Sequence, residues 1–319
     1  MASTIVELFG YSPTDKSKSA KSARASSKCP FIGKTCTKTL SDGLISGVCT
    51  IKPATSGPVI CCPIRLYAGD YQILRDVAHV AFGAQVKLIL GADALAEARR
   101  SKDGNTVAVF GKRWGKELRL PKRGGGGYFV DWILARIGPD GDLAEFVAVE
   151  VQSIDTTGNY RNERKAYLEG KLPIKKSTAN PNWENVSKRI LIQLIFKGHV
   201  LRREPLCQKG LFFICPTPVY ERIKMRLGGY LEEYHYQAGS LAMRWYDIGG
   251  SKADGVIRDL HFGGQIVTTT DQVAKALSSP EKLPPQRVYE DAIRTELGLP
   301  LATNPTKDSQ RTAQGRKQS

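Results

Sequence analysis

The pattern of apolar residues becomes regular near residue 70. From Ile73 to Phe82 apolar side chains recur every three or four positions, which predicts a helix of about three turns beginning at Asp70. The segments 86–90 and 106–110 are short and apolar, so we expect a strand at each, with a helix at 92–100 between them. The chain therefore mixes helices and strands from this point on.

Two longer apolar segments, 128–137 and 144–153, have the composition of strands. The residues between them, 138–142, read Gly-Pro-Asp-Gly-Asp, and these residue types favour tight turns. We therefore expect the two strands to pair as a hairpin.

An apolar stripe farther along predicts a helix at 185–197, with Asn182 as a candidate N-cap. The residues of this stripe are Val186, Ile190, Leu194 and Ile195. Two more apolar strands are expected at 211–215 and 243–248. The alternation of strands and helices places the fold in the α/β or α+β class.

The two ends of the chain have a different composition. Residues 11–28 carry five basic side chains and little to bury, so we expect a loop or a short solvated helix. Residues 29–63 are rich in Gly, Ser, Thr and Pro, and hydrophobic burial alone would hold them poorly. We divide the chain into an N-terminal segment at 1–66, a main domain at 67–300 and a disordered tail at 301–319.

The net charge of +16 narrows the class of partner. Such a surplus attracts polyanions, and nucleic acid is favoured over a membrane because we see no lysine-rich amphipathic helix and no lipidation motif. No apolar run is long enough to span a bilayer, and the first residues lack the order of a secretion signal. We expect a cytoplasmic, nucleic-acid-binding protein.

Two acids interrupt the predicted hairpin strands. An unpaired carboxylate buried there would be unfavourable by several kcal/mol, so Asp131 and Glu150 need a cation or a proton. Strand alternation puts Glu150 and Gln152 on one face, and hairpin pairing would bring Asp131 beside them. Two carboxylates and an amide suit Mg²⁺. The alternative is that the acids are strand-end residues or partners of a buried arginine such as Arg136.

The cysteines form a second candidate site. Cys29, Cys36 and Cys49, followed by Cys61 or Cys62, supply four thiolates, enough for a closed tetrahedral metal site. Such a site would order the N-terminal segment, and four thiolates suit zinc or iron. The alternative is a set of small buried thiols. Cys207 and Cys215 stand apart, and we expect them to be inert core residues.

Other chemistry finds little support. The four histidines form no Cys-His or Ser-His-Asp arrangement, so nucleophilic catalysis by the protein is not expected. The glycine run 124–127 lacks the Lys-Ser/Thr of a phosphate-binding loop, and we see no dinucleotide-binding motif. A nucleotide cofactor is not expected.

The cysteines and acids, taken in chain order, resemble the NotI-like restriction endonucleases. The motifs that carry this resemblance are Phe9-Gly10-Tyr11-Ser12, Cys29-Pro30-Phe31, Cys36-Thr37-Lys38, Gly47-Val48-Cys49, Cys62-Pro63, Asp131, Glu150-Val151-Gln152, Asp155-Thr156-Thr157-Gly158-Asn159-Tyr160, Asn182-Trp183 and the helix with Gln193 and Lys197. The similarity covers most of residues 7–220.

The resemblance implies a homodimeric type II restriction endonuclease that cuts double-stranded DNA with Mg²⁺, with a preference for GC-rich palindromes. It implies a PD-(D/E)XK core, a mixed central sheet flanked by helices, with Asp131 and Glu150 as metal ligands. Gln152 stands where many members of the wider superfamily have lysine. The resemblance also implies a four-cysteine iron site in a small N-terminal element, for which we select Cys62 over Cys61.

Candidate DNA-backbone contacts are Lys112, Arg113, Lys122, Arg123 and Arg161, which could equally be solvated loop residues. Two other functions fit part of the pattern. A non-catalytic, metal-stabilised DNA-binding protein would explain the charge and the cysteines but not the acids in the strands. A structure-specific DNA-repair nuclease would share the acids.

Overall fold

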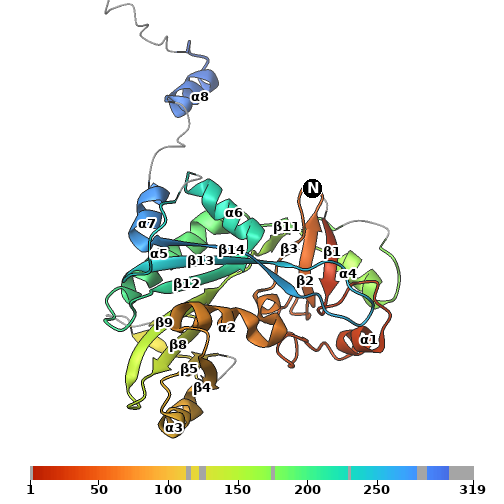
Figure 1. Cartoon of the computed structure of the whole chain (residues 1–319). Helices are drawn as coiled ribbons and strands as arrows, with labels where there is room; N and C mark the ends of the chain where they lie inside the picture. Colours follow the sequence, from red (N-terminus) through yellow and green to blue (C-terminus); the bar gives the residue numbers. More distant parts are fainter. Residues whose placement is uncertain are drawn as a thin grey trace, which may run out of the picture. The chain divides into compact units, whose positions relative to one another are not determined.

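The predicted hairpin lies in the middle of a seven-stranded mixed sheet (Figure 1). The computed structural model describes residues 3–112, 116–121, 127–173, 177–228, 231–278 and 286–301. Strands β8 (Trp132–Ile137) and β9 (Leu143–Val151) are antiparallel, with Trp132 opposite Val149. The hairpin prediction is confirmed.

The strand order in this sheet is β14-β13-β12-β9-β8-β5-β4. Strands β9, β12 and β13 are parallel to one another, so their carboxyl ends lie at the same edge of the sheet. The other strands are β4 (Lys87–Leu90), β5 (Thr106–Gly111), β12 (Leu211–Pro216), β13 (Ser240–Ile248) and β14 (Leu260–Thr269). The strands expected at 86–90, 106–110, 211–215 and 243–248 are all present, whereas β14 was not predicted.

Helices flank both faces of the sheet, which makes the fold α/β (Figure 1). On one face, α2 (Ala68–Phe82) packs on the side chains of Val147 and Val149. On the other face, α5 (Leu191–Leu201) and α6 (Thr217–Arg226) cover Ala148 and Phe213, and α3 (Gly91–Ser101) and α7 (Thr270–Ser278) belong to the same buried cluster. Alternate residues of β9 therefore enter two separate hydrophobic clusters.

The strand predicted at 128–137 is wrong as a single element. Residues Gly127–Phe129 form β7, which pairs with β6 (Arg119–Pro121) outside the main sheet, and β8 begins only at Trp132. Val130, which lies between the two strands, is also apolar and buried, so the apolar run in the sequence has no gap at the break. Asp131 thus lies between two strands and not within one.

The predicted helices are present with altered ends. In α2 the backbone of residues 69–71 is left-handed, so regular helix begins at Gln72, whereas we expected Asp70. The helix expected at 185–197 is a π-helical turn, Val186–Ile190, followed by α5. Asn185, which precedes this turn, has helical backbone angles and makes no side-chain capping bond, and the backbone N–H of Asn182 donates to the carbonyl oxygen of Asp155 (2.7 Å).

The N-terminal segment has more buried contacts than its composition suggests. Strands β1 (Ser3–Leu8), β2 (Val48–Pro53) and β3 (Val59–Ile60) form a small antiparallel sheet, and α1 (Lys18–Ala25) is the short helix anticipated within 11–28. Its core residues, including Leu8 and Ile51, belong to the same cluster as α2 and β9. The segment is therefore held on the main sheet by hydrophobic packing, contrary to the expectation that burial would contribute little.

The remaining elements are short. They are the 3-10 turn η1 (Pro63–Tyr67), α4 (Arg161–Leu168), the paired strands β10 (Thr156–Thr157) and β11 (Asn180–Pro181), and α8 (Val288–Glu296). The chain divides into two units at residue 278, and α8 belongs to the second. Apart from Leu301, the tail expected to be disordered lies outside the described residues. None of the helices described is long and apolar enough to cross a membrane.

Candidate active site

The two acids singled out in the sequence meet at the start of β8 and the end of β9. Because Trp132 is opposite Val149, Asp131 lies beside the next residue of β9, Glu150. The backbone N–H of Val151 donates to Asp131 Oδ2 (2.8 Å), which holds this carboxylate across the strand pair. Hairpin register therefore brings both acids to one end of the sheet.

Gly111 allows this close approach from the neighbouring strand β5. A Cβ atom at position 111 would lie 2.7 Å from the carbonyl oxygen of Asp131 and 2.3 Å from the Trp132 ring. Trp132 in turn donates its indole N–H to the Tyr67 hydroxyl (3.1 Å). The backbone that carries Asp131 is thus tightly packed against β5.

Glu150 projects toward α5, where it meets a lysine. Lys197 Nζ lies 2.5 Å from Glu150 Oε1, and the two side chains are only 12% and 9% exposed. The second oxygen, Oε2, is buried and has no hydrogen-bond partner among the residues that the structure describes. Burial raises the pKa of the Glu150 carboxyl to about 7, and the charge of Asp131 acts in the same direction. The Lys197 ammonium and the backbone N–H of Asp131 oppose both.

Gln152 directly follows β9, which ends at Val151, so the expectation that it shares a face with Glu150 stays a prediction. Its backbone N–H donates to the carbonyl oxygen of Ile214 on β12 (2.9 Å), and its side-chain amide donates to the carbonyl oxygen of Ser153 (3.2 Å). The alternative partner Arg136 does not reach either acid of the site. It forms an ion pair with Glu145 instead (2.9 Å).

Lys197 is the site residue that reasoning from chemistry missed. It entered the sequence analysis only as part of a family motif. Its helix has a buried stripe of Leu191, Leu194, Gly198 and Leu201, and Lys197 borders that stripe three residues after Leu194. A lysine next to the buried face of an apolar helix was the available signal, because such an ammonium needs a buried anion as partner.

The donor set suits a divalent cation with an incomplete shell of protein ligands. Among the described residues, no three His, Cys, Asp or Glu side chains form a cluster able to hold a metal ion. Mg²⁺, however, is usually bound by one or two carboxylates together with water and phosphate oxygens. The unpartnered, buried Oε2 of Glu150 is the atom that such an ion would satisfy.

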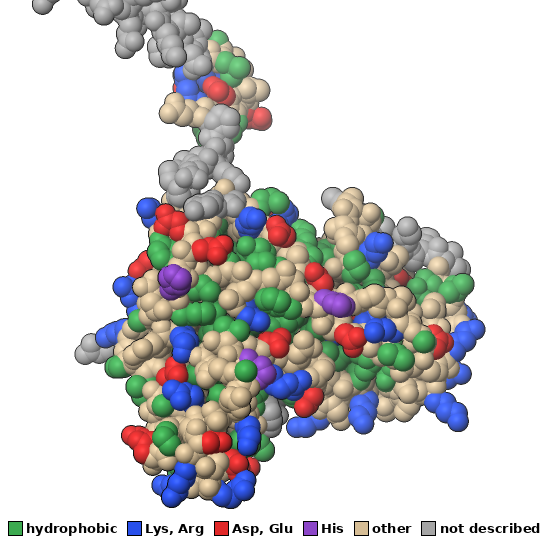
Figure 2. Space-filling view, viewed as in Figure 1, with side chains coloured by type: hydrophobic (Ala, Val, Ile, Leu, Met, Phe, Trp, Pro, Cys, Tyr) green, Lys and Arg blue, Asp and Glu red, His purple; other side chains and the backbone are tan. Residues whose placement is uncertain are grey.

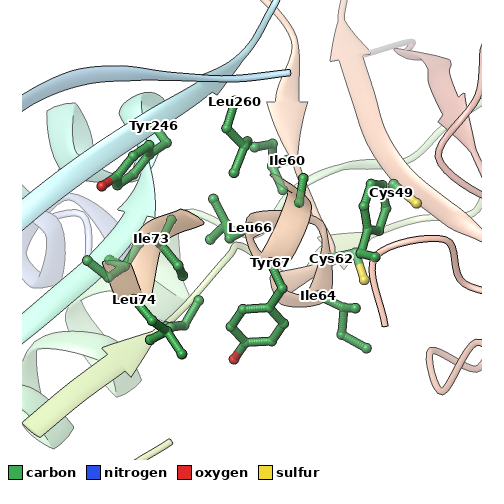
Figure 3. Close-up of a cluster of buried hydrophobic side chains, with 14 of the residues drawn as sticks. Cys49, Ile60, Cys62, Ile64, Leu66, Tyr67, Ile73, Leu74, Tyr246 and Leu260 are labelled. Carbon is green, nitrogen blue, oxygen red and sulfur yellow. The ribbon is translucent and has the colours of Figure 1, made fainter. Parts of the chain in front are cut away.

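The five N-terminal cysteines are all buried and none is in a disulfide. Cys49 and Cys62 lie near each other at one end of a buried cluster (Figure 3). Burial raises the pKa of the Cys62 thiol to about 11, and burial together with the neighbouring Cys62 raises the pKa of the Cys49 thiol well above its usual value.

Cys61 has a different environment from Cys62. The ammonium of Lys38 lies 3.3 Å from the Cys61 sulfur, and it also donates to the carbonyl oxygens of Cys61 (2.7 Å) and Val48 (3.3 Å). The Cys61 sulfur is also within hydrogen-bond reach of the carbonyl oxygen of Cys49 (3.5 Å). Cys61 is thus engaged by Lys38 and by the β2 backbone.

The candidate DNA contacts are only partly described. Lys112 is exposed directly after β5, while Arg113, Lys122 and Arg123 lie outside the described residues. Arg161 forms an ion pair with Asp42 (2.6 Å) and a hydrogen bond with Ser41, which ties α4 to the cysteine segment. Figure 2 shows further Lys and Arg side chains on one face of the protein. In the N-terminal segment, Lys16, Lys18, Lys21 and Lys28 are exposed.

A groove of about 680 Å³ is lined by residues at the same edge of the sheet. Thr217, which directly follows β12, lines it together with Trp183 and Arg222. The guanidinium of Arg222 lies over the Trp183 ring, 5.3 Å from its centroid. This edge therefore presents a cation and an aromatic face close to the strand end that carries Gln152.

Comparison with protein families gives one finding. The model of the family described as restriction endonuclease NotI matches residues 14–209. The matched region includes the five N-terminal cysteines, both acids, Gln152 and Lys197. A comparison with curated proteins gave no match.

Proposed function

The chain belongs to the NotI restriction endonuclease family, and on that basis we propose that it cuts double-stranded DNA at a specific sequence with Mg²⁺ held by Asp131 and Glu150. Membership of the family makes the protein a restriction endonuclease, a hydrolase that acts on DNA. The identity of the metal, its ligands and a GC-rich palindromic target are parts of our proposal.

The observation that carries this proposal is the environment of Glu150. Its Oε1 is paired with Lys197, whereas its Oε2 is buried without a partner among the described residues. Leaving a buried carboxylate oxygen unsatisfied is unfavourable by about 1–3 kcal/mol or more. A cation held by Glu150 and Asp131 would remove that penalty.

The roles of the side chains follow from this geometry. Bound Mg²⁺ would supply an acidified water and neutralise charge on the scissile phosphate. Val151 holds Asp131 in place through its backbone N–H. The neutral amide of Gln152 can position a water or a phosphate oxygen by hydrogen bonds but cannot contribute a charge. A positive charge near the site comes instead from Lys197.

The test uses isosteric variants of the two acids. Asp131→Asn and Glu150→Gln should each lose plasmid cleavage in Mg²⁺ while binding DNA without divalent cations as the wild type does. Glu145→Gln is the matched control, because Glu145 lies on the same strand and is paired with Arg136 and Lys209. Wild-type cleavage by either acid variant would refute the assignment.

The same plasmid assay separates the alternatives. A sequence-specific endonuclease produces discrete fragments, a non-catalytic DNA-binding protein leaves the plasmid intact, and a structure-specific repair nuclease nicks only structured DNA. The mixed sheet flanked by helices supports a PD-(D/E)XK core. We further propose a homodimer, since one symmetric pair of active sites can cut both strands of a palindrome.

We also propose that Cys29, Cys36, Cys49 and Cys62 bind a structural iron or zinc ion. Four buried thiols in one segment are the donor set that these metals prefer, although no three of the described His, Cys, Asp or Glu side chains form a group able to hold a metal ion. Cys61 is less suitable because Lys38 already contacts its sulfur. Metal content should fall in Cys62→Ser and persist in Cys61→Ser, and equal loss from both would contradict this choice.

DNA affinity should come from phosphate contacts of the basic surface. We retain Lys112, Arg113, Lys122 and Arg123 as candidates, and Arg161 as one that would have to give up its pairing with Asp42. The groove beside Trp183 and Arg222 offers a further contact at the same edge as the acids.

A further inference from the structure

The ion pair between Lys197 and Glu150 differs from a second buried ion pair among the described residues, that of Glu7 and Arg65. Glu7 and Arg65 are both fully buried, and both oxygens of Glu7 are bonded: Arg65 reaches each of them (2.9 and 3.1 Å), and the Thr50 hydroxyl donates to one (2.5 Å). The acid of this pair is therefore satisfied within the fold, and the buried atom without a described partner is Nη1 of Arg65.

Lys197 is the side chain that pairs with Glu150, and the backbone N–H of Asp131 also favours its ionised form. Lys197 takes Oε1, and Oε2 remains buried without a partner among the described residues. The neighbouring charge of Asp131 disfavours ionisation of Glu150, and Lys197 supplies the opposing positive charge. A buried carboxylate oxygen without a partner is an atom that a metal ion or an ordered water would satisfy.

The position of Lys197 is fixed by the packing of its helix. Helix α5 packs against α7, and a Cβ atom at Gly198 would lie 2.2 Å from Thr270 Oγ1. Leu194, three residues before Lys197, and Gly198, the next residue after it, are buried. The backbone that carries the ammonium therefore has little freedom to move away from β9.

We propose that Lys197 is a positioning residue, which fixes Oε1 of Glu150 so that Oε2 is presented to the metal ion and, through it, to the DNA phosphate. This inference rests on the proposed nuclease function. It gives the ammonium a role that the neutral Gln152 cannot perform, and it makes α5 part of the active site. Loss of a residue that orients a metal ligand typically lowers metal affinity or activity by about 10- to 100-fold.

The experiment compares Lys197→Gln, Lys197→Arg and the control Lys188→Gln. Lys188 lies on the same helical segment but is 73% exposed and is paired only with Glu184 four residues earlier. Two quantities are measured besides melting temperature: single-turnover cleavage in Mg²⁺, and the factor by which Ca²⁺ strengthens binding to a cleavable duplex. Ca²⁺ serves as a probe because it can bridge carboxylates and phosphate as Mg²⁺ does.

We expect Lys197→Gln to cut about 10- to 100-fold more slowly and to lose the Ca²⁺-dependent gain in DNA binding, with Ca²⁺-free binding unchanged. Lys197→Arg should recover part of both quantities because it keeps the charge and the donors, and Lys188→Gln should match the wild type. If Lys197→Gln fails to fold, the comparison of Lys197→Arg with the wild type still tests whether the position of the positive charge matters for cleavage and for the Ca²⁺-dependent gain in DNA binding.

Two results would overturn the inference: cleavage and Ca²⁺ gain in Lys197→Gln within about threefold of the wild type, or a Lys197→Arg variant no better than Lys197→Gln. Failure of the proposed function looks different. In that case the wild-type protein itself does not cut DNA in Mg²⁺, or Glu150→Gln cuts as well as the wild type.

Discussion

The buried ion pair between Glu7 and Arg65 offers the clearest test of what holds the N-terminal segment on the sheet. Both side chains are 0% exposed, and they join β1 to the turn before α2. Arg65 also donates to the carbonyl oxygen of Arg258 (2.7 Å) and lies over the Phe31 ring, 4.9 Å from its centroid. Arg65→Met removes the charge but keeps most of the side-chain volume.

The expected loss follows from the charge that is left behind. Without Arg65 the carboxylate of Glu7 is buried with only the Thr50 hydroxyl as a side-chain partner, and removing one member of such a pair lowers the free energy of unfolding by about 3–5 kcal/mol. Replacing both residues, as in Glu7→Leu/Arg65→Met, removes the unpaired charge. The double variant should therefore be more stable than Arg65→Met alone.

Urea unfolding monitored by tryptophan fluorescence measures both effects through the transition midpoint and slope. The control is Arg100→Met, because Arg100 is 77% exposed and its pairing with Glu97 should contribute at most about 1 kcal/mol. The reasoning is refuted if Arg65→Met unfolds within about 1 kcal/mol of the wild type, or if the double variant is less stable than Arg65→Met.

Three further predictions concern the site and its support. Gly111→Ala should reduce both cleavage and stability, the latter by about 1–3 kcal/mol, because the new Cβ meets the Asp131 carbonyl and the Trp132 ring; an active, fully stable variant would contradict this packing. Tyr67→Phe should lower the free energy of unfolding by about 1–3 kcal/mol by leaving the buried Trp132 indole N–H without its acceptor, which thermal or urea unfolding would measure. Burial raises the pKa of Glu163 in the folded state. Its contribution to the free energy of unfolding should therefore fall as pH rises from its unfolded pKa to its folded pKa. Glu163→Gln should flatten that decline when unfolding is measured as a function of pH, and an unchanged pH profile would count against this prediction.

Some features of the site could be predicted from the sequence because they depend on neighbouring residues alone. The turn residues 138–142 predict the hairpin that brings Asp131 beside Glu150. The helical period likewise identified most of the buried residues of α2. These are local rules, and they held.

Local rules failed where a distant segment decides the structure. The apolar run 128–137 looks continuous, but pairing of β7 with β6 and of β8 with β9 breaks it at Asp131. The segment 29–63 looks poor in core residues, yet it packs on α2 and on β9. In both cases the deciding contact comes from elsewhere in the chain.

The sequence by itself determined the class of fold, the two acids and their shared end of a hairpin, and the family to which the motifs point. Only the tertiary structure brought Lys197 to Glu150 across 47 positions of sequence, and only it showed that Arg136 pairs with Glu145. The physical reason is that periodicity reports which way a side chain faces. Which charge the side chain meets there depends on how α5, which lies between β9 and β12 in the sequence, packs on the sheet. That packing is set by the whole core.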